Sequence, residues 1–233
     1  MKSELDIKQC EVCACTPTLK LCKYLSQEEI FTIHRNKREV TFHPGEIIFK
    51  EGMTATHIAC LRSGLAKAYT EGSKGKRLLM GILTPTEFVG GMGMYVDDLH
   101  HFSVAALTET RICLIDIRDF KEVLSQNNFF CQELIKRNNG KAIKSLKSTL
   151  NLTQKNMHGR VADAILYFKE SIFKSDVYEI PLSRQELADM VSLTKESLIR
   201  IIKEFKQAGY ITVQQNNLVI LNEEALKKVS INS

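Results

Sequence analysis

One short stretch of the sequence combines apolar and charged residues at helical spacing. In residues 194–205, TKESLIRIIKEF, an apolar stripe is formed by Leu198, Ile201, Ile202 and Phe205. The opposite flank carries Lys195, Glu196, Ile199, Arg200 and Lys203. Because arginine can donate two hydrogen bonds to guanine and glutamate can accept one from cytosine, this flank predicts contacts to base edges in a DNA major groove. The alternative is an ordinary packed helix on which Glu196 and Arg200 form an exposed pair.

The cysteines form a second group that could do chemistry. The first 22 residues contain Cys10, Cys13, Cys15 and Cys22, and Cys113 lies in a predicted strand. Clustered thiolates are ligands for iron–sulfur clusters and for zinc. A zinc site built from the four N-terminal cysteines, a regulatory disulfide and plain reduced thiols are the alternatives, and a stable disulfide is the least expected of these in the cytosol. Cys60 and Cys131 are expected to be buried small hydrophobic residues.

The charged flank needs elements that hold it outward, and the neighbouring sequence predicts them. Ser183 followed by Glu186 is a capping box that predicts the start of a first helix, and Thr194 predicts the start of a second. Residues 210–213 and 218–221 predict two short strands, with Asn216 and Asn217 suited to the turn between them. Two helices followed by a hairpin predict a winged helix-turn-helix, whose hairpin would lie along the phosphate backbone.

The rest of the chain divides into stretches of different pattern. Residues 24–35 predict a short helix capped near Ser26, and short β runs punctuated by glycines between residues 38 and 117 predict a β-sandwich or barrel-like roll. Residues 119–152 and 157–172 predict helices. The chain is therefore expected to be α+β, with a cysteine-rich head at 1–22, a β-roll at 23–120, a long helix at 121–153 and the winged helix-turn-helix at 154–233.

The long helix carries a narrow apolar stripe made of Ile143, Leu146 and Leu150, flanked by basic residues. A stripe this narrow suits the pairing of the helix with its copy in a second subunit, so these three residues are the predicted dimer seam. The alternative is that the stripe packs against its own domain. Gly140 weakens this helix locally by about 1 kcal/mol relative to alanine.

Length and composition are those of an ordinary globular protein. The chain has 233 residues, of which 44% are hydrophobic and 25% charged, and two domains are the natural number for this length. The formal net charge of +5 favours an anionic partner such as double-stranded DNA. No apolar run is long enough for a membrane span and the opening residues lack a signal core, so the expectation is a cytoplasmic protein.

The order of these parts resembles the Crp/Fnr family of the cAMP receptor protein and the fumarate and nitrate reduction regulator. The resemblance is carried by PGEIIFKEG at 44–52, IACLRSGLAKAY at 58–69, EFVGG at 87–91, RICLIDI at 111–117 and, most specifically, SRQELADMVSLTKESLIRIIKEFKQAGYI at 183–211. It implies a cyclic-nucleotide-binding-like roll, a dimerisation helix and a winged helix-turn-helix. It also implies a homodimeric transcriptional regulator that binds an inverted-repeat operator under a redox or small-molecule signal, and that contacts RNA polymerase if it is an activator.

The resemblance implies roles for individual DNA-binding residues. Lys195, Glu196 and Arg200 match the base-contacting positions, and Ile199 could touch a thymine methyl group. The phosphate-contacting set is Ser183, Arg184, Gln185 and Lys203. Ser192 departs from the family because a turn glycine is frequent there, and a serine adopts that turn with some strain, which puts the angle of the helix in doubt.

The resemblance also separates two kinds of sensor. The cyclic-nucleotide branch holds the ribose with Gly-Glu and the phosphate with Arg-Ser, whereas this chain has Gly91 and Phe102 where the charged residues would be. A buried cyclic nucleotide would lack its counter-charge, so tight cAMP binding is not expected. In the oxygen-sensing branch, three N-terminal cysteines and one in the roll hold an iron–sulfur cluster, which implies a [4Fe-4S] site at Cys10, Cys13, Cys22 and Cys113.

Two other classes of protein compete with a DNA-binding regulator. An enzyme is not predicted, because Gly72–Arg77 lacks the spacing of a phosphate loop and the adjacent His100 and His101, expected in an exposed loop, have no supporting carboxylate pair. The second alternative is a ligand-sensing module that uses its C-terminal helices for protein contacts instead of DNA. Steep salt dependence of DNA binding would discriminate between the two.

Overall fold

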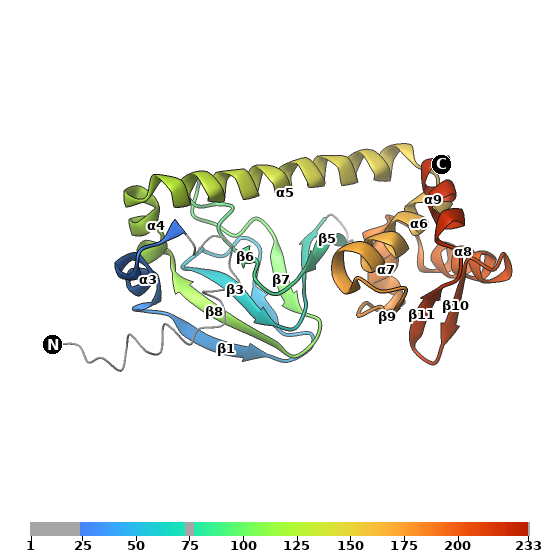
Figure 1. Ribbon diagram of the computed structural model, residues 1–233, viewed down its shortest axis with the longest axis horizontal. Coiled ribbons are helices and arrows are strands. Elements are labelled where there is room, and N and C mark those ends of the chain that lie inside the picture. Colours follow the sequence, from blue (N-terminus) through green and yellow to red (C-terminus); the bar gives the residue numbers. More distant parts are fainter. Residues whose placement is uncertain (1–23, 73–76, 233) are drawn as a thin grey trace. The chain divides into compact units, whose positions relative to one another are not determined.

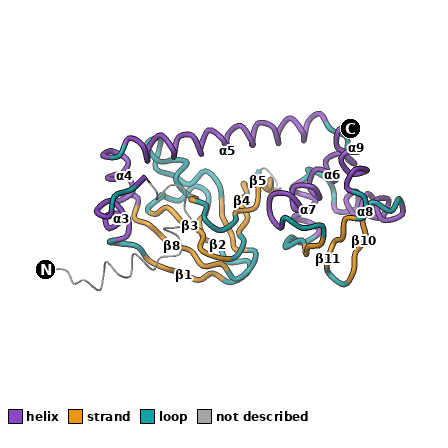
Figure 2. Tube along the Cα trace, in the orientation of Figure 1, coloured by secondary structure: helices purple, strands orange, loops and turns teal. Residues whose placement is uncertain are grey.

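The computed structural model describes residues 24–72 and 77–232, so the head cysteines and residues 73–76 lie outside the described residues. The chain forms two compact units. The first contains the described residues up to Thr70 together with Ile82–Ala142, and the second contains Glu71–Gly81 and the described residues from Ile143 onward. Strands dominate the first unit and helices the second, which confirms the expected α+β class (Figures 1 and 2).

Two antiparallel sheets form a roll that belongs to the first unit, apart from residues 77–81 of one strand and the last residue of another, Glu71. One sheet has the order β1-β8-β3-β6, formed by Arg38–Phe42, Thr110–Asp116, His57–Ser63 and Phe88–Val89. The other has the order β2-β7-β4-β5, formed by Ile47–Phe49, Ser103–Ala106, Ala66–Glu71 and Arg77–Leu83. Ala59, Leu61, Val104 and Ile112 pack between the strands and fill the interior of the roll. Short strands with glycine turns therefore form the predicted roll.

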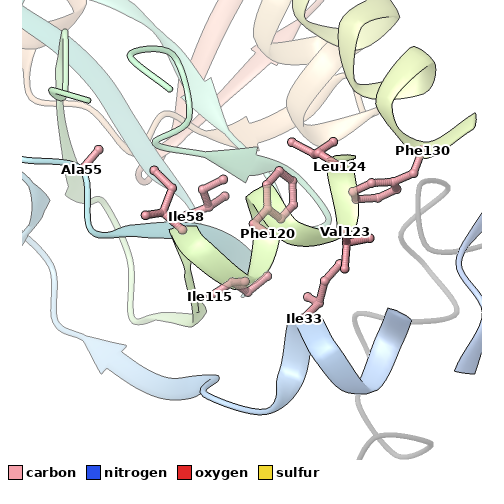
Figure 3. Packing of buried hydrophobic residues seen from close by; sticks show 9 residues of the cluster. Ile33, Ala55, Ile58, Ile115, Phe120, Val123, Leu124 and Phe130 are labelled. Atoms are coloured by element: carbon pink, nitrogen blue, oxygen red, sulfur yellow. The ribbon is translucent and has the colours of Figure 1, made fainter. Parts of the chain in front are cut away.

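A second core lies on the other face of the first sheet, beneath two helices. These are α3, Gln27–His34, and α4, Ile117–Gln126. Figure 3 shows Ile33, Phe120 and Phe130 gathered against the strand residues Ile58 and Ile115. The predicted capping box of Ser26 is present at the start of α3. Arg35 just after α3 donates to the buried carboxylate of Asp119 on α4 at 2.7 Å, and this bond raises the pKa of the guanidinium.

The helix predicted over residues 119–152 is two helices, because Asn127 interrupts it. Asn127 has an extended backbone, and its side-chain oxygen accepts a hydrogen bond from the N–H of Phe130 at 2.9 Å. Its amide group donates to the carbonyl oxygen of Tyr24 at 2.8 Å. The long helix α5 then runs over Asn128–Gln154. A polar residue with a local capping role therefore ends α4 and starts α5, which the apolar periodicity alone did not reveal.

Among its described residues the second unit contains the end of α5 from Ile143 onward, five further helical segments and a small sheet. The five segments are α6, Met157–Tyr167; the π-helix η3, Phe168–Phe173; α7, Arg184–Met190; α8, Lys195–Gln207; and α9, Glu223–Ile231. The sheet has the order β10-β11-β9, formed by Ile211–Gln214, Asn217–Ile220 and Val177–Glu179. The sequence predicted neither β9 nor α9, and the predicted helix 157–172 changes to a π-helix at Phe168.

The hairpin of β10 and β11 lies one residue from its predicted place. Its two-residue turn is Gln215–Asn216, and not Asn216 with Asn217, because Asn217 pairs with Gln214 at the end of the ladder. Gln215 has the left-handed backbone conformation, φ 54°. The third strand, β9, is held by Tyr178, which is stacked on Phe173 and donates its hydroxyl hydrogen to the carbonyl oxygen of Ile165 at 2.6 Å. Burial raises the pKa of this phenol.

Candidate DNA-reading face and sensor strands

The first helix of the predicted helix-turn-helix starts where the sequence indicates. The Oγ of Ser183 accepts a hydrogen bond from the N–H of Glu186 at 3.2 Å, and the Glu186 carboxylate accepts one from the N–H of Ser183 at 2.8 Å. Leu187 is buried, whereas Met190 is only half-buried. Two reciprocal bonds at the N-terminus fix the first turn of α7 and therefore the place from which α8 follows.

The second helix, α8, presents the predicted flank to solvent. Thr194 is its N-cap and accepts a hydrogen bond from the N–H of Ser197 at 3.2 Å. The apolar stripe is buried, and it consists of Leu198, Ile201, Ile202 and Phe205. The flank is exposed, and it consists of Lys195, Glu196, Ile199, Arg200 and Lys203. Burial of one stripe by the rest of the unit therefore orients a mixed-charge face outward, as base readout requires.

One charged side chain of this face, Arg200, lies close to a carboxylate that is itself held by another helix. The guanidinium of Arg200 is 60% exposed and lies 3.9 Å from the carboxylate of Glu204, one helical turn away. The same carboxylate lies 2.6 Å from Nε2 of His158 on α6. Glu196 and Arg200, the pair considered in the alternative interpretation, share no ion pair among the described contacts, so the carboxylate nearest Arg200 is that of Glu204.

The turn between α7 and α8 adopts the strained form expected for Ser192. Its φ is 51°, in the left-handed region that favours glycine. Arg160 of α6 donates from Nη1 to the carbonyl oxygens of Val191 at 3.1 Å and Ser192 at 3.2 Å. A glycine would adopt this turn without strain. Here charge-assisted bonds from a neighbouring helix stabilise the strained turn instead.

The predicted phosphate-contacting residues lie at exposed positions of the same unit. Ser183, Arg184 and Gln185 occupy the start of α7, where backbone N–H groups and the helix dipole favour an anion. The side chains of two of them also make local bonds, since Ser183 caps the helix and Gln185 donates to Asp189 at 2.8 Å. Lys203 is exposed on α8.

The predicted dimer seam is uncovered in the single chain. Ile143, Leu146 and Leu150 on α5 are 55%, 63% and 45% exposed, so the structure does not bury them within their own domain. Phe129 and Ile135 extend the exposed apolar surface toward the start of the helix. None of the residues that the structure describes comes within 4 Å of a Cβ placed on Gly140, so this glycine serves no close approach among them.

Of the predicted cluster ligands, only Cys113 lies among the described residues. It is 1% exposed on β8 and packs with Cys60 under Leu25 and Phe88. Within residues 24–72 and 77–232 no three side chains are arranged to hold a metal ion. Cys10, Cys13, Cys15 and Cys22 lie outside this part. Leu25 packs beside Cys113, and the three residues from Cys22 to Leu25 can span no more than about 10 Å, so covalent geometry permits a shared site.

Gly90 and Ser103, in the region that matches the cyclic-nucleotide site, are closely packed or hydrogen-bonded to other parts of the chain. Gly90 has a φ of 102°, and an added Cβ would lie 2.9 Å from a ring carbon of Phe49 and 3.3 Å from one of His100. Phe49 and His100 are stacked with ring centroids 4.3 Å apart. Ser103 is buried and its hydroxyl accepts a hydrogen bond from the N–H of Glu51 at 3.1 Å. Aromatic packing thus lies directly against Gly90, next to the position of Gly91.

The two adjacent histidines have different surroundings, which corrects one expectation. His100 is 7% exposed and not in an exposed loop, because its ring stacks on Phe49, and burial lowers its pKa. His101 is exposed and lies 3.1 Å from the carboxylate of Asp97. The Gly72–Arg77 segment falls largely outside the described residues.

Sequence reasoning missed two residues and one residue pairing that shape these sites. Arg160 and His158 belong to α6, far from the helix-turn-helix in sequence, and no local pattern connects them to it. Cys60 was assigned to the core, which is correct for its burial, but its pairing with Cys113 depends on strand register. Long-range pairing of this kind leaves no signal in a single sequence.

Comparisons with known proteins agree with the two units. Residues 39–127 match the cyclic nucleotide-binding domain family, and residues 159–229 match the Crp-like helix-turn-helix domain family. The chain is 25% identical to the nitrogen fixation regulation protein FixK of Bradyrhizobium diazoefficiens over 221 residues, covering 91% of this chain and 90% of that protein. It is 24% identical to the fumarate and nitrate reduction regulatory protein of Escherichia coli over 204 residues, covering 83% and 79% of the two chains.

Solved structures share the fold. The structure of FixK2 from Bradyrhizobium japonicum superposes with a TM-score of 0.76 at 19% identity, covering 83% of this chain and 96% of that one. The c-di-GMP-responsive global regulator CLP of Xanthomonas campestris gives a TM-score of 0.70 at 16% identity, covering 84% and 99%. No helix in the described part of the chain is both long and apolar enough to span a lipid bilayer.

Proposed function

Because the chain belongs to the Crp/Fnr family of transcriptional regulators, we propose that it binds an inverted-repeat operator as a homodimer under control of a redox or small-molecule signal. The relatives are transcription regulators and not enzymes. The observation that carries the DNA-binding proposal is α8, whose buried stripe leaves Lys195, Glu196 and Arg200 exposed. We place the protein in the cytoplasm, with RNA polymerase as a further partner if it activates transcription.

Base recognition is assigned to the first two turns of α8. Lys195, Glu196, Ile199 and Arg200 are the proposed base contacts, with Ile199 47% exposed and able to meet a thymine methyl group. Ser183, Arg184, Gln185 and Lys203 are the proposed phosphate contacts, because they flank this face at exposed positions. The phosphate contacts give affinity and register, and the base contacts give specificity.

The experiment begins with selection of bound fragments from genomic DNA, which yields the half-site. On that operator, Arg200→Ala is expected to cost about 1–3 kcal/mol, while binding to unrelated DNA stays nearly unchanged. Lys206→Ala is the matched control, because it removes one positive charge from the last turn of the same helix. Equal losses on both kinds of DNA for Arg200→Ala would remove base readout from the proposal. A flat salt dependence would instead favour a module that contacts protein.

The proposed homodimer uses the apolar stripe of α5. Ile143, Leu146 and Leu150 are more exposed than apolar side chains of a monomer need to be, and they repeat along one side of the helix. Two such subunits would carry their recognition helices to successive major grooves, about one DNA turn apart. Leu146→Glu should convert a dimer to a monomer in sedimentation, whereas Lys147→Glu, an exposed neighbour, should not. A monomeric unmodified protein at micromolar concentration would refute the seam.

For the sensor we propose a [4Fe-4S] cluster held by Cys10, Cys13, Cys22 and Cys113. The fit rests on Cys113, which is a buried thiol beside Leu25 and therefore within reach of the head. Such a cluster would supply one-electron redox chemistry, while the chain supplies the thiolates and their apolar cover. Anaerobic purification, a visible spectrum and iron analysis test it. Cys113→Ala should lose iron, but it should leave metal bound if zinc sits on the four head cysteines alone. A colourless, iron-free protein rules out the cluster.

Tight cAMP binding is not part of the proposed function. Gly91 and Phe102 replace the charged residues of the cyclic-nucleotide branch, and the stacked rings of Phe49 and His100 pack against the neighbouring Gly90. Burying the phosphate without a counter-charge costs several kcal/mol. Titration calorimetry is expected to detect no binding at micromolar cAMP, and micromolar affinity would contradict this assignment.

A further inference from the structure

Cys60 and Cys113 lie directly opposite each other on neighbouring strands. They are register partners in the antiparallel pair β3 and β8, near the middle of the sheet shown in Figure 1. Side chains at partner positions project from the same face of a sheet, with Cβ atoms about 4.5–5.5 Å apart. Two thiols that are far apart in the sequence are therefore brought side by side by the register alone.

The pair occupies the helix-covered face of the sheet and not the interior of the roll. Ile58 and Ile115, two residues away along each strand and thus on the same face, belong to the core beneath α3 and α4. Leu61 and Ile112, on the opposite face, pack inside the roll. Leu25 and Phe88 close over the two thiols, each of which belongs to a residue only 1% exposed. The pair is therefore separate from the region that matches the nucleotide site.

We infer that Cys60 and Cys113 form a modification site, an oxidisable dithiol that closes to a cross-strand disulfide. Disulfides join residues whose Cα atoms are about 4.4–6.8 Å apart, and partner residues of antiparallel strands are about 4.5 or 5.5 Å apart. Disulfide Cβ atoms are about 3.5–4.5 Å apart, so the two Cβ atoms must approach each other by up to about 1 Å, a local shift that leaves β3 paired with β8. Leu25 and Phe88 must open transiently to admit the oxidant, which makes the reaction slower than oxidation of an exposed thiol.

A hydroperoxide is the oxidant named by this inference. One thiol attacks the peroxide oxygen, the O–O bond breaks, and a sulfenic acid and one water molecule are formed from hydrogen peroxide. The second thiol then attacks the sulfenic sulfur and releases a second water molecule as the S–S bond forms. Two thiols and one hydrogen peroxide thus give one disulfide and two water molecules. A dithiol reductant reverses the reaction by exchange.

The regulatory meaning of this bond rests on the proposed function. The disulfide consumes the sulfur of Cys113 that the proposed cluster would use, so the two states exclude each other. It also lies close to the dimer helix, because Cys60 is the register partner of Phe88 on β6, and the carbonyl oxygen of Phe88 accepts a hydrogen bond from Lys141 of α5 at 3.2 Å. Phe88, Cys60 and Cys113 lie side by side across β6, β3 and β8, so a covalent bond between the two cysteines is one strand away from a contact with α5.

The test uses the full chain with Cys10, Cys13, Cys15 and Cys22 all changed to serine, which leaves three of the seven cysteines. Hydrogen peroxide is added, the protein is denatured in acid, and remaining thiols are counted by a maleimide mass shift. The expected result is one reactive thiol, that of Cys131, a protein about 2 Da lighter, and a peptide pair joining Cys60 to Cys113 in a digest. Dithiothreitol should restore three thiols. Cys131→Ser added to this variant should leave none.

Two results overturn the inference. One is three reactive thiols after peroxide treatment in a variant whose circular dichroism shows it folded, and the other is a disulfide that maps to Cys131 instead of Cys60. If the serine variant does not fold, the same peptide is sought in the unmodified chain, where its absence overturns the inference equally. Iron and DNA are absent from this assay, so a protein that never binds a cluster, or an operator, does not affect its outcome.

The burial of the pair gives a second readout. Leu25→Ala thins the cover and should make the disulfide form several-fold faster at the same peroxide concentration. Leu83→Ala is the matched control, because Leu83 packs on the interior side of the roll and should leave the rate unchanged. Equal acceleration by both substitutions would mean that general loosening of the fold controls the reaction. It would contradict the inference that Leu25 and Phe88 limit access of the oxidant to Cys60 and Cys113.

Discussion

The DNA-reading unit and the sensor unit are assembled by contacts of different range along the chain. The reading face depends on caps only three residues from their partners, such as Ser183 with Glu186 and Thr194 with Ser197. The sensor depends on pairings between distant segments, such as Arg35 with Asp119, 84 residues apart. The starts of the reading helices are therefore set by neighbouring residues, whereas the chemistry of the sensor is set by which distant residues the strand register brings together.

This difference explains which features could be predicted from the sequence. The starts of α3, α7 and α8 follow from capping residues, and the buried stripe of α8 follows from its period. The strand β9 and the pairing of Cys60 with Cys113 could not be predicted, because each depends on a partner far away in sequence. Within the reading unit the same limit applies to Arg160, whose bonds to the turn cross from α6. The division of the long helix at Asn127 was missed for another reason, since its cap is a local bond to Phe130 that apolar periodicity does not register.

The largest expected effect comes from emptying one core in each unit. Phe205→Ala and Phe120→Ala both remove a buried ring, and each should lower the free energy of unfolding of its own unit by about 3–5 kcal/mol. Hydrogen exchange followed by mass spectrometry reports each unit separately. Loss of protection should stay within the unit that carries the substitution. Equal loss in both units after either change would show that they unfold together and would end the comparison.

A matched pair of glycines, one in each unit, sharpens the comparison between the sensor and the reader. Gly64 in the sensor and Gly209 in the reader both have positive φ, 84° and 71°. Alanine at either position should cost about 1–2 kcal/mol for the backbone alone. At Gly64 the new Cβ would also lie 2.3 Å from the carbonyl oxygen of Glu109, adding about 1–3 kcal/mol, whereas at Gly209 it meets no described atom within 4 Å. In urea denaturation the free energy of unfolding should be clearly lower for Gly64→Ala than for Gly209→Ala. Similar values for the two variants would contradict this packing argument.

The two hydrogen bonds from Arg160 to the turn between α7 and α8, called here the Arg160 brace, test whether the reading unit also depends on a contact between distant segments. Arg160→Met removes the bonds to the carbonyl oxygens of Val191 and Ser192 and should cost about 1.5–3 kcal/mol of stability in the second unit. Ser192→Gly relieves the left-handed serine, so it should stabilise the unmodified protein and recover part of the loss in the double variant. Lys206→Met is the control for charge. Strict additivity of Arg160→Met and Ser192→Gly would show that the brace and the turn are not coupled.

The smallest expected effect is a difference between the two units in how their stability depends on acid pH, because their helix caps differ in chemistry. Hydrogen bonds from the Arg118 side chain, aided by its backbone N–H, lower the pKa of Asp116, the N-cap of α4, to about 2. A folded pKa below the unfolded value of 3.8 means that this stabilisation is complete above about pH 4 and is lost as the pH falls toward 2. Ser183 and Thr194 cap the reading helices without titrating in that window. Asp116→Asn should therefore flatten the acid dependence of the sensor and leave that of the reader unchanged. An unchanged acid profile of the sensor in Asp116→Asn would assign its acid sensitivity to other carboxylates.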